Sequence, residues 1–385
     1  MALHFERADY AARLAALQAG MASANLDGLL LFAQESHYWL TGYDTFGFCF
    51  FQCLYVGADG RMALLTRSAD LRQAQHTSLI ADIRVWTDAA EADPAVDLRR
   101  MLDDLGVAGA RLGVEYDSYG LTYANGLRLA AALDGSCALQ DASRLVPGLR
   151  VTKSAAEIAF VREAARLSDA ADAAAQAATA PGADEGDILA AQHAAIFGGG
   201  GDYPGNEFII GSGADALLCR YKSGRRRLDP NDQLTLEFAG AYRHYHAAIM
   251  RTLVVGEPRP LHLRYHAAAR AALAACEAAF RPGRTAGDVY AAHARIFDQH
   301  DLGQHRLNAC GYSLGAKFTP SWMDPPMFYA RNPFVIAENQ VFFAHMILMD
   351  SETGTAMCLG RTSLVTSTGA EPLNAANLDL VVKSR

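Results

Sequence analysis

The sequence predicts an α+β protein in which a smaller α/β domain precedes a larger domain built on an antiparallel sheet. Up to about residue 147, short apolar strands alternate with helical segments, which is typical of an α/β layer. Beyond it, long Ala-rich helical runs are separated by long apolar strands, which indicates helices gathered on one face of a mainly antiparallel sheet. A chain of 385 residues has room for two domains. We expect them at 1–150 and 151–385.

The smaller domain is expected to begin with a helix over residues 7–23. Four side chains recur there at helical spacing: Tyr10, Leu14, Leu17 and Met21. A hairpin should follow, because Gly57–Gly60 supplies turn residues between two apolar runs. The expected strands are Leu29–Phe32, Phe48–Val56, Arg61–Thr66, Ile83–Trp86 and Arg111–Glu115, with a helix around Val96–Leu105.

The larger domain is expected to open with a long helix over Ser154–Ala180. Ser154 and Glu157 form a capping box, which marks the start of a helix. A second helix over residues 185–197 should end at Gly198–Gly201. The other expected elements are the helices His262–Phe280 and Ala286–His300 and the strands Phe208–Gly211, Gln233–Val255, Gln340–Met349 and Met357–Thr366.

Composition excludes several classes of function. The 34 basic and 42 acidic side chains give a net charge of −8, and no basic tract occurs, so nucleic acid is not expected as a partner. The apolar stretches are far shorter than the ~18–20 residues of a membrane helix, and no secretion signal is recognisable. Seven cysteines without a Cys-x-x-Cys pair indicate free thiols in a reducing compartment. We therefore expect a soluble, cytoplasmic protein.

The densest polar cluster of the sequence lies within residues 236–252. One strand carries Glu237, a turn is expected near Ala239–Gly240, and the chain then returns. Four residues of the return strand should share one face: His244, His246, Ala248 and Met250. A carboxylate and two imidazoles on one hairpin suit a general base, a general acid or a metal site. The alternative is an exposed polar strand edge.

This hairpin resembles the first metal-binding motif of the creatinase/prolidase/methionine-aminopeptidase family, whose catalytic domain has the pita-bread fold. In that motif two Asp residues eleven positions apart precede Thr-Arg-Thr, and Arg251-Thr252 match its end. The other family motifs are matched in order by Lys153–Ile158, Gly311–Gly315, Glu338–Met346 and Gly360–Thr366. The resemblance implies a pita-bread catalytic domain over 151–385 and a creatinase-type N-terminal domain over 1–150.

The metal ligands of this family are largely replaced here. Its peptidases hold two metal ions with Asp, Asp, His, Glu and Glu. The matching positions are Glu237, Ala248, Tyr312, His345 and Gly360. Because only Glu237 keeps a carboxylate, the resemblance implies that the two-metal site is lost and that no cofactor is bound. The alternative is a single-metal site rebuilt from Glu237, His246 and His345.

Among metal-free members of the family, creatinase and the ectoine hydrolases cleave C–N bonds outside peptides. The chain resembles the ectoine hydrolases at Gly200–Pro204, Ser212–Ala216 and Trp39–Asp44. The resemblance implies a homodimer in which the N-terminal domain of one subunit covers the pocket of the other, with Trp39 and Tyr43 facing substrate. Arg220 stands where this subgroup has a His, so the substrate need not be ectoine.

The catalytic candidates are Glu237, His246, His345 and Tyr312. Glu237 is predicted to be nucleophile or base, and the alternative is a strand carboxylate paired with an arginine. His246 or His345 would carry the proton to the leaving nitrogen, although His246 could equally be a buried structural histidine. Tyr312 would hydrogen-bond a developing anion, or simply pack.

The substrate-binding candidates begin with Arg220, which suits a substrate carboxylate through a bidentate contact. The alternative is a surface arginine. The other candidates are Tyr203, Asp202, Trp39, Tyr43 and Arg251.

Three functions are consistent with these residues. The first is a metal-independent hydrolase that opens a C–N bond in a small, carboxylate-bearing cyclic amidine or related compound. The second is a metal-dependent Xaa-Pro dipeptidase or aminopeptidase with a rebuilt site. The third is a non-catalytic binding protein that keeps the scaffold of an enzyme.

Overall fold

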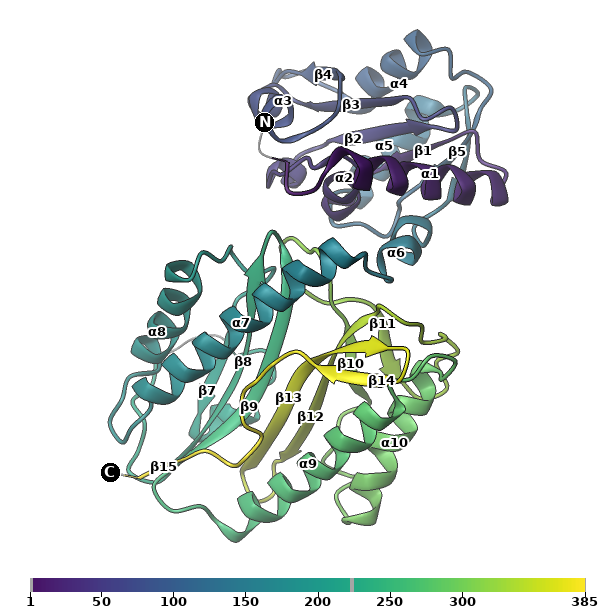
Figure 1. Ribbon diagram of the computed structural model, residues 1–385. Coiled ribbons are helices and arrows are strands. Elements are labelled where there is room, and N and C mark those ends of the chain that lie inside the picture. The colour runs from purple at the N-terminus through teal and green to yellow at the C-terminus, as the bar shows by residue number, and fades with distance from the viewer. Residues whose placement is uncertain (1–2, 222–224, 385) are drawn as a thin grey trace. The chain divides into compact units, whose positions relative to one another are not determined.

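The computed structural model describes residues 3–221 and 225–384 of the chain. They belong to two compact units, Met1–Arg150 and Val151–Arg385, shown as ribbons in Figure 1. Each unit has its own sheet and its own buried apolar clusters. Both units mix helices with strands, as the predicted α+β class requires.

The N-terminal unit has a mixed sheet with helices on both faces. Its helices are α1 (Arg7–Ser23), α2 (Gln34–Thr41), α3 (Leu71–Thr77), α4 (Pro94–Asp104), α5 (Tyr123–Leu133) and α6 (Leu145–Arg150). Its strands are β1 (Gly28–Leu31), β2 (Cys53–Gly57), β3 (Met62–Arg67), β4 (Asp82–Trp86), β5 (Arg111–Val114) and β6 (Ala138–Asp141), paired in the order β4-β3-β2-β1-β5-β6.

Side chains that alternate along β1 explain the two helical layers. Leu30 lies in a cluster with residues of α4 and α5, whereas Leu29 and Leu31 lie in a cluster with residues of α1 and α2. All of these side chains are buried. Burial on both faces agrees with the parallel pairing of β1 with β5.

The structure corrects one predicted strand of this unit and adds elements that were not predicted. Strand β2 begins at Cys53 and not at Phe48, because Gly47–Cys49 forms a 3-10 turn. Helices α2, α3, α5 and α6 and strand β6 were not expected.

The C-terminal unit is built on a long antiparallel sheet. Its helices are α7 (Ala155–Ala178), α8 (Glu185–Gly198), α9 (Pro260–Ala279) and α10 (Ala286–Gln299). Its strands are β7 (Ile209–Ser212), β8 (Asp232–Tyr242), β9 (Tyr245–Val255), β10 (Ala309–Ser313), β11 (Asp324–Tyr329), β12 (Val341–Asp350), β13 (Thr355–Thr366), β14 (Gly369–Pro372) and β15 (Val382–Lys383). The main strand order is β11-β10-β12-β13-β9-β8-β7, with β14 beside β13 and β15 beside β9.

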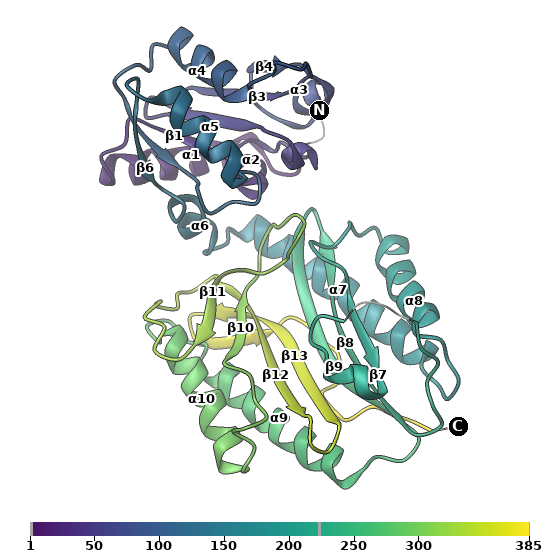
Figure 2. The same cartoon turned by 180° about the vertical axis from the view of Figure 1, so that it is seen from behind.

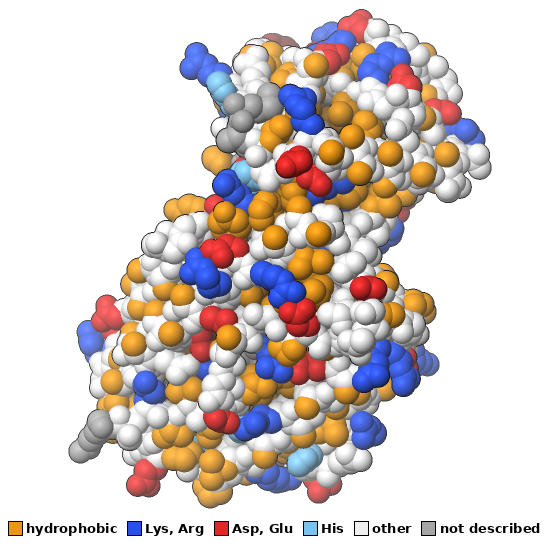
Figure 3. Space-filling model, in the orientation of Figure 1, with side chains coloured by type: hydrophobic (Ala, Val, Ile, Leu, Met, Phe, Trp, Pro, Cys, Tyr) orange, Lys and Arg blue, Asp and Glu red, His pale blue; other side chains and the backbone are white. Residues whose placement is uncertain are grey.

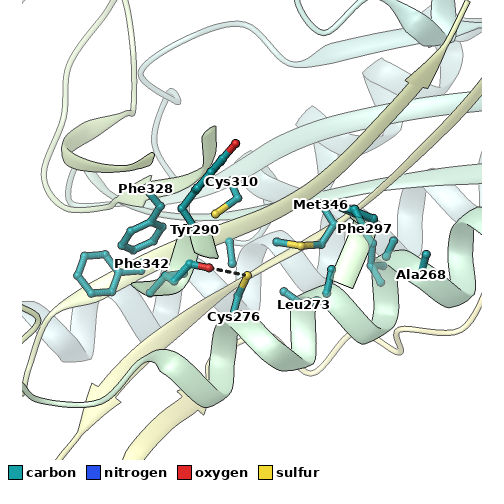
Figure 4. Close-up of a cluster of buried hydrophobic side chains, with 14 of the residues drawn as sticks. Ala268, Leu273, Cys276, Tyr290, Phe297, Cys310, Phe328, Phe342 and Met346 are labelled. Atoms are coloured by element: carbon teal, nitrogen blue, oxygen red, sulfur yellow. Dashed lines mark hydrogen bonds between the residues drawn. The ribbon is translucent and has the colours of Figure 1, made fainter. Parts of the chain in front are cut away.

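Helices α7 and α9 cover one face of this sheet. Helix α7 packs on β8 and β9, and α9 packs on β12 and β13. In Figure 2 the strands lie in front of both helices, so that view shows the face that α7 and α9 leave uncovered. The main core lies on the helix side: Leu273 and Cys276 of α9 and Phe297 of α10 pack with Phe342 and Met346 of β12 (Figure 4). Burying each such large apolar side chain stabilises the fold by ~1.5–3 kcal/mol.

The turn of the β8–β9 hairpin lies later than predicted. Arg243 and His244 form it, and both have positive φ angles, 52° and 63°, as a two-residue hairpin turn requires. Gly240 is therefore a strand residue and not a turn residue. A Cβ atom at Gly240 would come within 2.1 Å of the Ala164 carbonyl oxygen, so glycine is needed there for close packing on α7. His244 consequently leaves the set of strand residues predicted to share a face.

The surface carries charges of both signs. On the face shown in Figure 3, acidic and basic side chains are interspersed, which agrees with the absence of a basic tract in the sequence. Within residues 3–221 and 225–384, none of the helices combines the length and apolar character needed to cross a bilayer.

Candidate active site

A row of residues crosses the uncovered face of the C-terminal sheet. Glu237 of β8 lies opposite Met250 of β9, Met250 opposite Gly360 of β13, and Gly360 opposite His345 of β12. Directly opposed residues of antiparallel strands point to the same side, so all four positions share this face. Ala248, two residues from Met250, also belongs to it.

Tyr312 completes this group from β10. It lies opposite Phe343, two residues before His345 on β12. The ring centroids of Tyr312 and His345 are 5.6 Å apart, and the Tyr312 hydroxyl donates a 3.0 Å hydrogen bond to Oε1 of Glu237. The five positions aligned with the family's metal ligands therefore lie on one face of the sheet.

Glu237 is the buried carboxyl group of this cluster. It is only 9% exposed. Burial raises its pKa to about 7, while the hydrogen bond from Tyr312 and the positive charge of Arg220 act in the opposite direction. The other oxygen, Oε2, has no hydrogen-bond partner among the described residues. A carboxyl that titrates near neutral pH and has one free oxygen is well matched to proton transfer.

His345 lies beside the ring of Tyr312, the residue that hydrogen-bonds Glu237, and is a neutral imidazole. It is 7% exposed, and burial lowers its pKa to about 4, with the charge of Arg220 acting in the same direction. Its Nδ1 atom is buried, and the structure shows no partner for it in the parts of the chain that are described.

Arg220 supplies positive charge to the cluster. Its side chain is exposed, yet its charge influences the pKa values of Glu237, Tyr312 and His345 together. For Tyr312 burial is the larger effect and raises the pKa well above its usual value. An exposed guanidinium whose charge reaches these buried groups is suited to a substrate carboxylate, and that contact stays a prediction.

The structure contradicts the prediction that His246 carries a proton. His246 is completely buried, its Nε2 accepts a 2.8 Å hydrogen bond from the Gly205 amide, and its Nδ1 lies 3.4 Å from the Gly315 carbonyl oxygen. Both ring nitrogens are thus engaged by backbone. Burial lowers its pKa to about 3, so the imidazole stays neutral and ties two loops to β9.

Arg251 is also misassigned by the sequence reasoning. It points to the helix face of β9, where Nη1 makes a 2.9 Å ion pair with the buried Asp172 of α7. Its other nitrogen, Nη2, donates to the Asn377 carbonyl oxygen. Because this guanidinium is on the side of the sheet opposite to Glu237, it cannot bind a substrate there.

Asp202 and Tyr203 lie at the end of the β8–β9 hairpin. Asp202 accepts a hydrogen bond from the backbone amide of His244 in the turn, at 3.3 Å. Tyr203 is 80% exposed and packs edge-on against Phe197. In the described chain neither contacts Glu237, so their predicted substrate contacts are not supported.

Trp39 and Tyr43 do not face a substrate either. Trp39 is 5% exposed and Tyr43 is fully buried, and both belong to the apolar cluster between α1, α2 and the N-terminal sheet. The exposed aromatic side chains of this stretch are Phe46 and Phe50 instead.

The residues on the uncovered face do not fit the metal site of the family. Ala248 and Gly360 have no side-chain donor, and the nitrogens of His246 are occupied by backbone. Across the described ranges, no group of three His, Cys, Asp or Glu side chains could hold a metal ion. What remains is a carboxyl, a phenol and one imidazole, which together suit proton transfer and hydrogen bonding.

Sequence reasoning missed Trp322. Its indole Nε1–H donates a 2.8 Å hydrogen bond to the Tyr312 hydroxyl, and the residue is 1% exposed. It lies in the loop between β10 and β11, outside any strand or helix with a readable period. Its sequence signal is weak: a single tryptophan that follows the Gly311–Gly315 motif closely.

The fold and this face define a class: two-domain proteins whose pita-bread domain follows an α/β domain. The sequence pattern of the family described as "Metallopeptidase family M24" matches residues 159–367, and that of the "Creatinase/Prolidase N-terminal domain" matches residues 13–152. The chain belongs to metallopeptidase family M24, a family of hydrolases. The fold predicted from the motifs is thereby confirmed.

Full-length relatives have names of two kinds. The chain is 25% identical to the ectoine hydrolase of Halomonas elongata over 100% of this chain and 99% of the relative. It is 29% identical to the uncharacterized hydrolase/peptidase y4tM of Sinorhizobium fredii over 99% of each. The crystal structure of dipeptidase PepE from Mycobacterium ulcerans matches with a TM-score of 0.85 and 26% identity, over 99% of this chain and 100% of that one.

Proposed function

We propose that the protein is a metal-independent hydrolase that cleaves a non-peptide C–N bond in a small, carboxylate-bearing cyclic amidine or related compound. The observation that carries this proposal is Glu237, a buried carboxyl with a pKa near neutrality whose Oε2 has no hydrogen-bond partner in the described parts of the chain. Two of the family's metal-ligand positions lack a donor, which favours chemistry without metal. The full-length likeness to an ectoine hydrolase supports a non-peptide substrate.

In the proposed reaction Glu237 acts as general base and then as general acid. Its carboxylate takes a proton from a water molecule while the water oxygen bonds to the amidine carbon. When the C–N bond breaks, the protonated carboxyl returns the proton to the leaving nitrogen, so that one water is consumed and an amide and an amine result. A pKa near 7 serves both steps at neutral pH. His345 would hydrogen-bond the substrate through Nδ1, and Arg220 would bind its carboxylate.

The test is turnover by Glu237→Gln in a screen of ectoine-like and creatine-like compounds. We expect the wild type to hydrolyse a compound of this kind and Glu237→Gln to lose ~10²–10⁴-fold in kcat, which is the usual contribution of a general acid–base. The exposed Glu338 provides a matched control, because Glu338→Gln makes the same change away from the site. Full activity in Glu237→Gln would show that the proposed mechanism is wrong.

A metal-dependent dipeptidase is the second candidate, because dipeptidase PepE is among the solved structures that match over the full length. Chelation separates the two candidates. We expect purified protein to carry well under one equivalent of transition metal and to keep its activity after treatment with a chelator. Metal close to one equivalent, lost together with activity on Xaa-Pro dipeptides, would establish the dipeptidase instead.

We also propose that the protein is a cytoplasmic homodimer in which the N-terminal domain of one subunit covers the site of the other. Its seven cysteines are all free, which supports a reducing compartment. Phe46 and Phe50, 77% and 45% exposed, are aromatic side chains that a partner subunit could cover. They take the place of Trp39 and Tyr43 in this proposal.

A further inference from the structure

Glu237 is the last member of a hydrogen-bonded chain that begins at a residue without a role so far. Trp322 Nε1 lies 2.8 Å from the Tyr312 hydroxyl oxygen, which lies 3.0 Å from Oε1 of Glu237. All three side chains are at least nine-tenths buried, with exposures of 1%, 3% and 9%. Water therefore competes little for these bonds.

The hydrogen bonds from Trp322 through Tyr312 to Glu237 can run in only one donor-to-acceptor direction. An indole N–H donates and cannot accept, so Trp322 must donate to a lone pair of the Tyr312 oxygen. The hydroxyl has a single proton, and that proton is then left for Glu237 Oε1, which accepts it. Without the indole, the hydroxyl could rotate and accept a hydrogen bond instead.

The indole is held in place from a second side. The Trp322 backbone amide donates a 3.1 Å hydrogen bond to Oδ1 of Asn206. The ring centroids of Phe208 and Trp322 are 6.3 Å apart, with the two ring planes tilted relative to each other. At Gly205 a Cβ atom would lie 2.8 Å from the Trp322 backbone nitrogen, so the two segments pack backbone to backbone. Gly205 in turn donates to His246 on β9. Trp322 thus has little freedom to move away from Tyr312.

We propose that Trp322 is a positioning residue of this site: its indole N–H directs the Tyr312 proton to Oε1 of Glu237 and so leaves Oε2 as the oxygen that meets the substrate. The inference rests on the proposed function, because it assigns which oxygen of the general base reacts. Trp322 acts through Tyr312 and need not touch the substrate itself.

The test compares Trp322→Phe with Trp86→Phe. Trp86 is a matched control, because its indole also donates one buried hydrogen bond, 2.8 Å long, to the Phe51 carbonyl oxygen in the other domain. On the compound that the wild type hydrolyses, we expect Trp322→Phe to lower kcat about tenfold with KM little changed, and Trp86→Phe to leave both unchanged. Tyr312→Phe should lower kcat at least as much, and adding Trp322→Phe to it should cause no further loss.

A spectroscopic measurement tests the chain without any substrate. The protein has three tryptophans, and in isotope-labelled protein each gives one indole N–H resonance. In Tyr312→Phe, which keeps the indole in the core, the Trp322 resonance should move toward that of Trp39, whose buried Nε1 lacks a partner in the described structure. The Trp86 resonance should stay in place.

The outcomes separate the two claims. Equal kcat in Trp322→Phe and Trp86→Phe, or an unmoved Trp322 resonance in Tyr312→Phe, would overturn the positioning role even if Glu237→Gln is inactive. A further loss in the double variant would show that Trp322 acts independently of Tyr312, which also contradicts the proposal. Full activity in Glu237→Gln would refute the proposed function, whatever the resonance of Trp322 does.

Discussion

At the scale of single residues, burying Glu237 should cost the protein stability. Its pKa rises from an ordinary value of 4.5 to about 7 because of burial. Below about pH 4 the group is protonated in both folded and unfolded chains, and there is no cost. As the pH rises through 7, the folded state must either hold a proton that the unfolded chain has lost or carry a buried charge. The cost then reaches its full value, on the order of 3 kcal/mol.

We therefore expect Glu237→Gln to be more stable than the wild type above about pH 8, by up to about 3 kcal/mol, and equally stable near pH 4. The measurement is the difference in Tm across this pH range, with Glu338→Gln as the control for loss of an exposed carboxylate. A difference independent of pH would mean that Glu237 is not the desolvated group described here. Greater stability with less activity is the usual mark of a functional residue.

The sequence identified the residues of the site whose position follows from a motif. Glu237, Tyr312 and His345 lie at motif positions on paired strands, so the fold brings them together whatever their side chains are. His246 and Arg251 could not be assigned in the same way. Their roles depend on partners remote in sequence, the Gly205 amide and Asp172, which no local pattern indicates.

At the scale of elements, helix α7 and strand β9 are joined by one side chain. Oε2 of Glu157 accepts from the Ser154 amide at 2.8 Å and so closes the capping box of α7, while Oε1 accepts from the Tyr245 hydroxyl at 2.6 Å. Tyr245 is buried and begins β9, the strand paired with Glu237. The capping box was predicted and is confirmed, but its second partner was not foreseen.

Glu157→Ala should therefore destabilise the protein by about 2–4 kcal/mol, the sum of a lost helix cap and a buried hydroxyl left without a partner. Ser154→Ala removes only the cap and should cost about 1 kcal/mol. Tyr245→Phe keeps the cap but takes this donor from the buried Glu157 carboxylate, so it should cost about 1–3 kcal/mol, less than Glu157→Ala. Thermal unfolding of the three variants checks this order, and equal losses in all three would contradict it.

Elements defined by local signals were predicted, whereas elements that depend on distant partners were not. Helices α7 to α10 carry caps or a sustained apolar face, and their predicted limits agree closely with the structure. Helix α2 has no such signal. All eight of its residues are buried, and Glu115, remote in sequence, accepts hydrogen bonds from the amides of Phe32 and Ala33 and from the Ser36 hydroxyl at its start. Gly240 misled the prediction of the turn because its role is close packing on α7.

At the scale of the whole molecule, the proposed dimer predicts the molar mass of the protein in solution and how its activity changes on dilution. Light scattering should give twice the chain mass of 41.3 kDa. Truncating an aromatic side chain at an interface typically costs about 1–4 kcal/mol of binding free energy, and replacing it with an acidic side chain costs at least as much. Phe46→Asp should therefore weaken dimer association by tenfold or more. Tyr329, 49% exposed in the other domain, provides the control Tyr329→Asp.

Activity should follow association if one subunit covers the site of its partner. Phe46→Asp should then lose activity on dilution, at concentrations where the wild type and Tyr329→Asp are still active, and should recover it when concentrated. Such recovery would separate a loss of assembly from a loss of folding, since an unfolded variant would stay inactive. A wild type that is monomeric and fully active at every concentration would refute the dimer. It would also show that a single subunit is enough for the reaction proposed for Glu237.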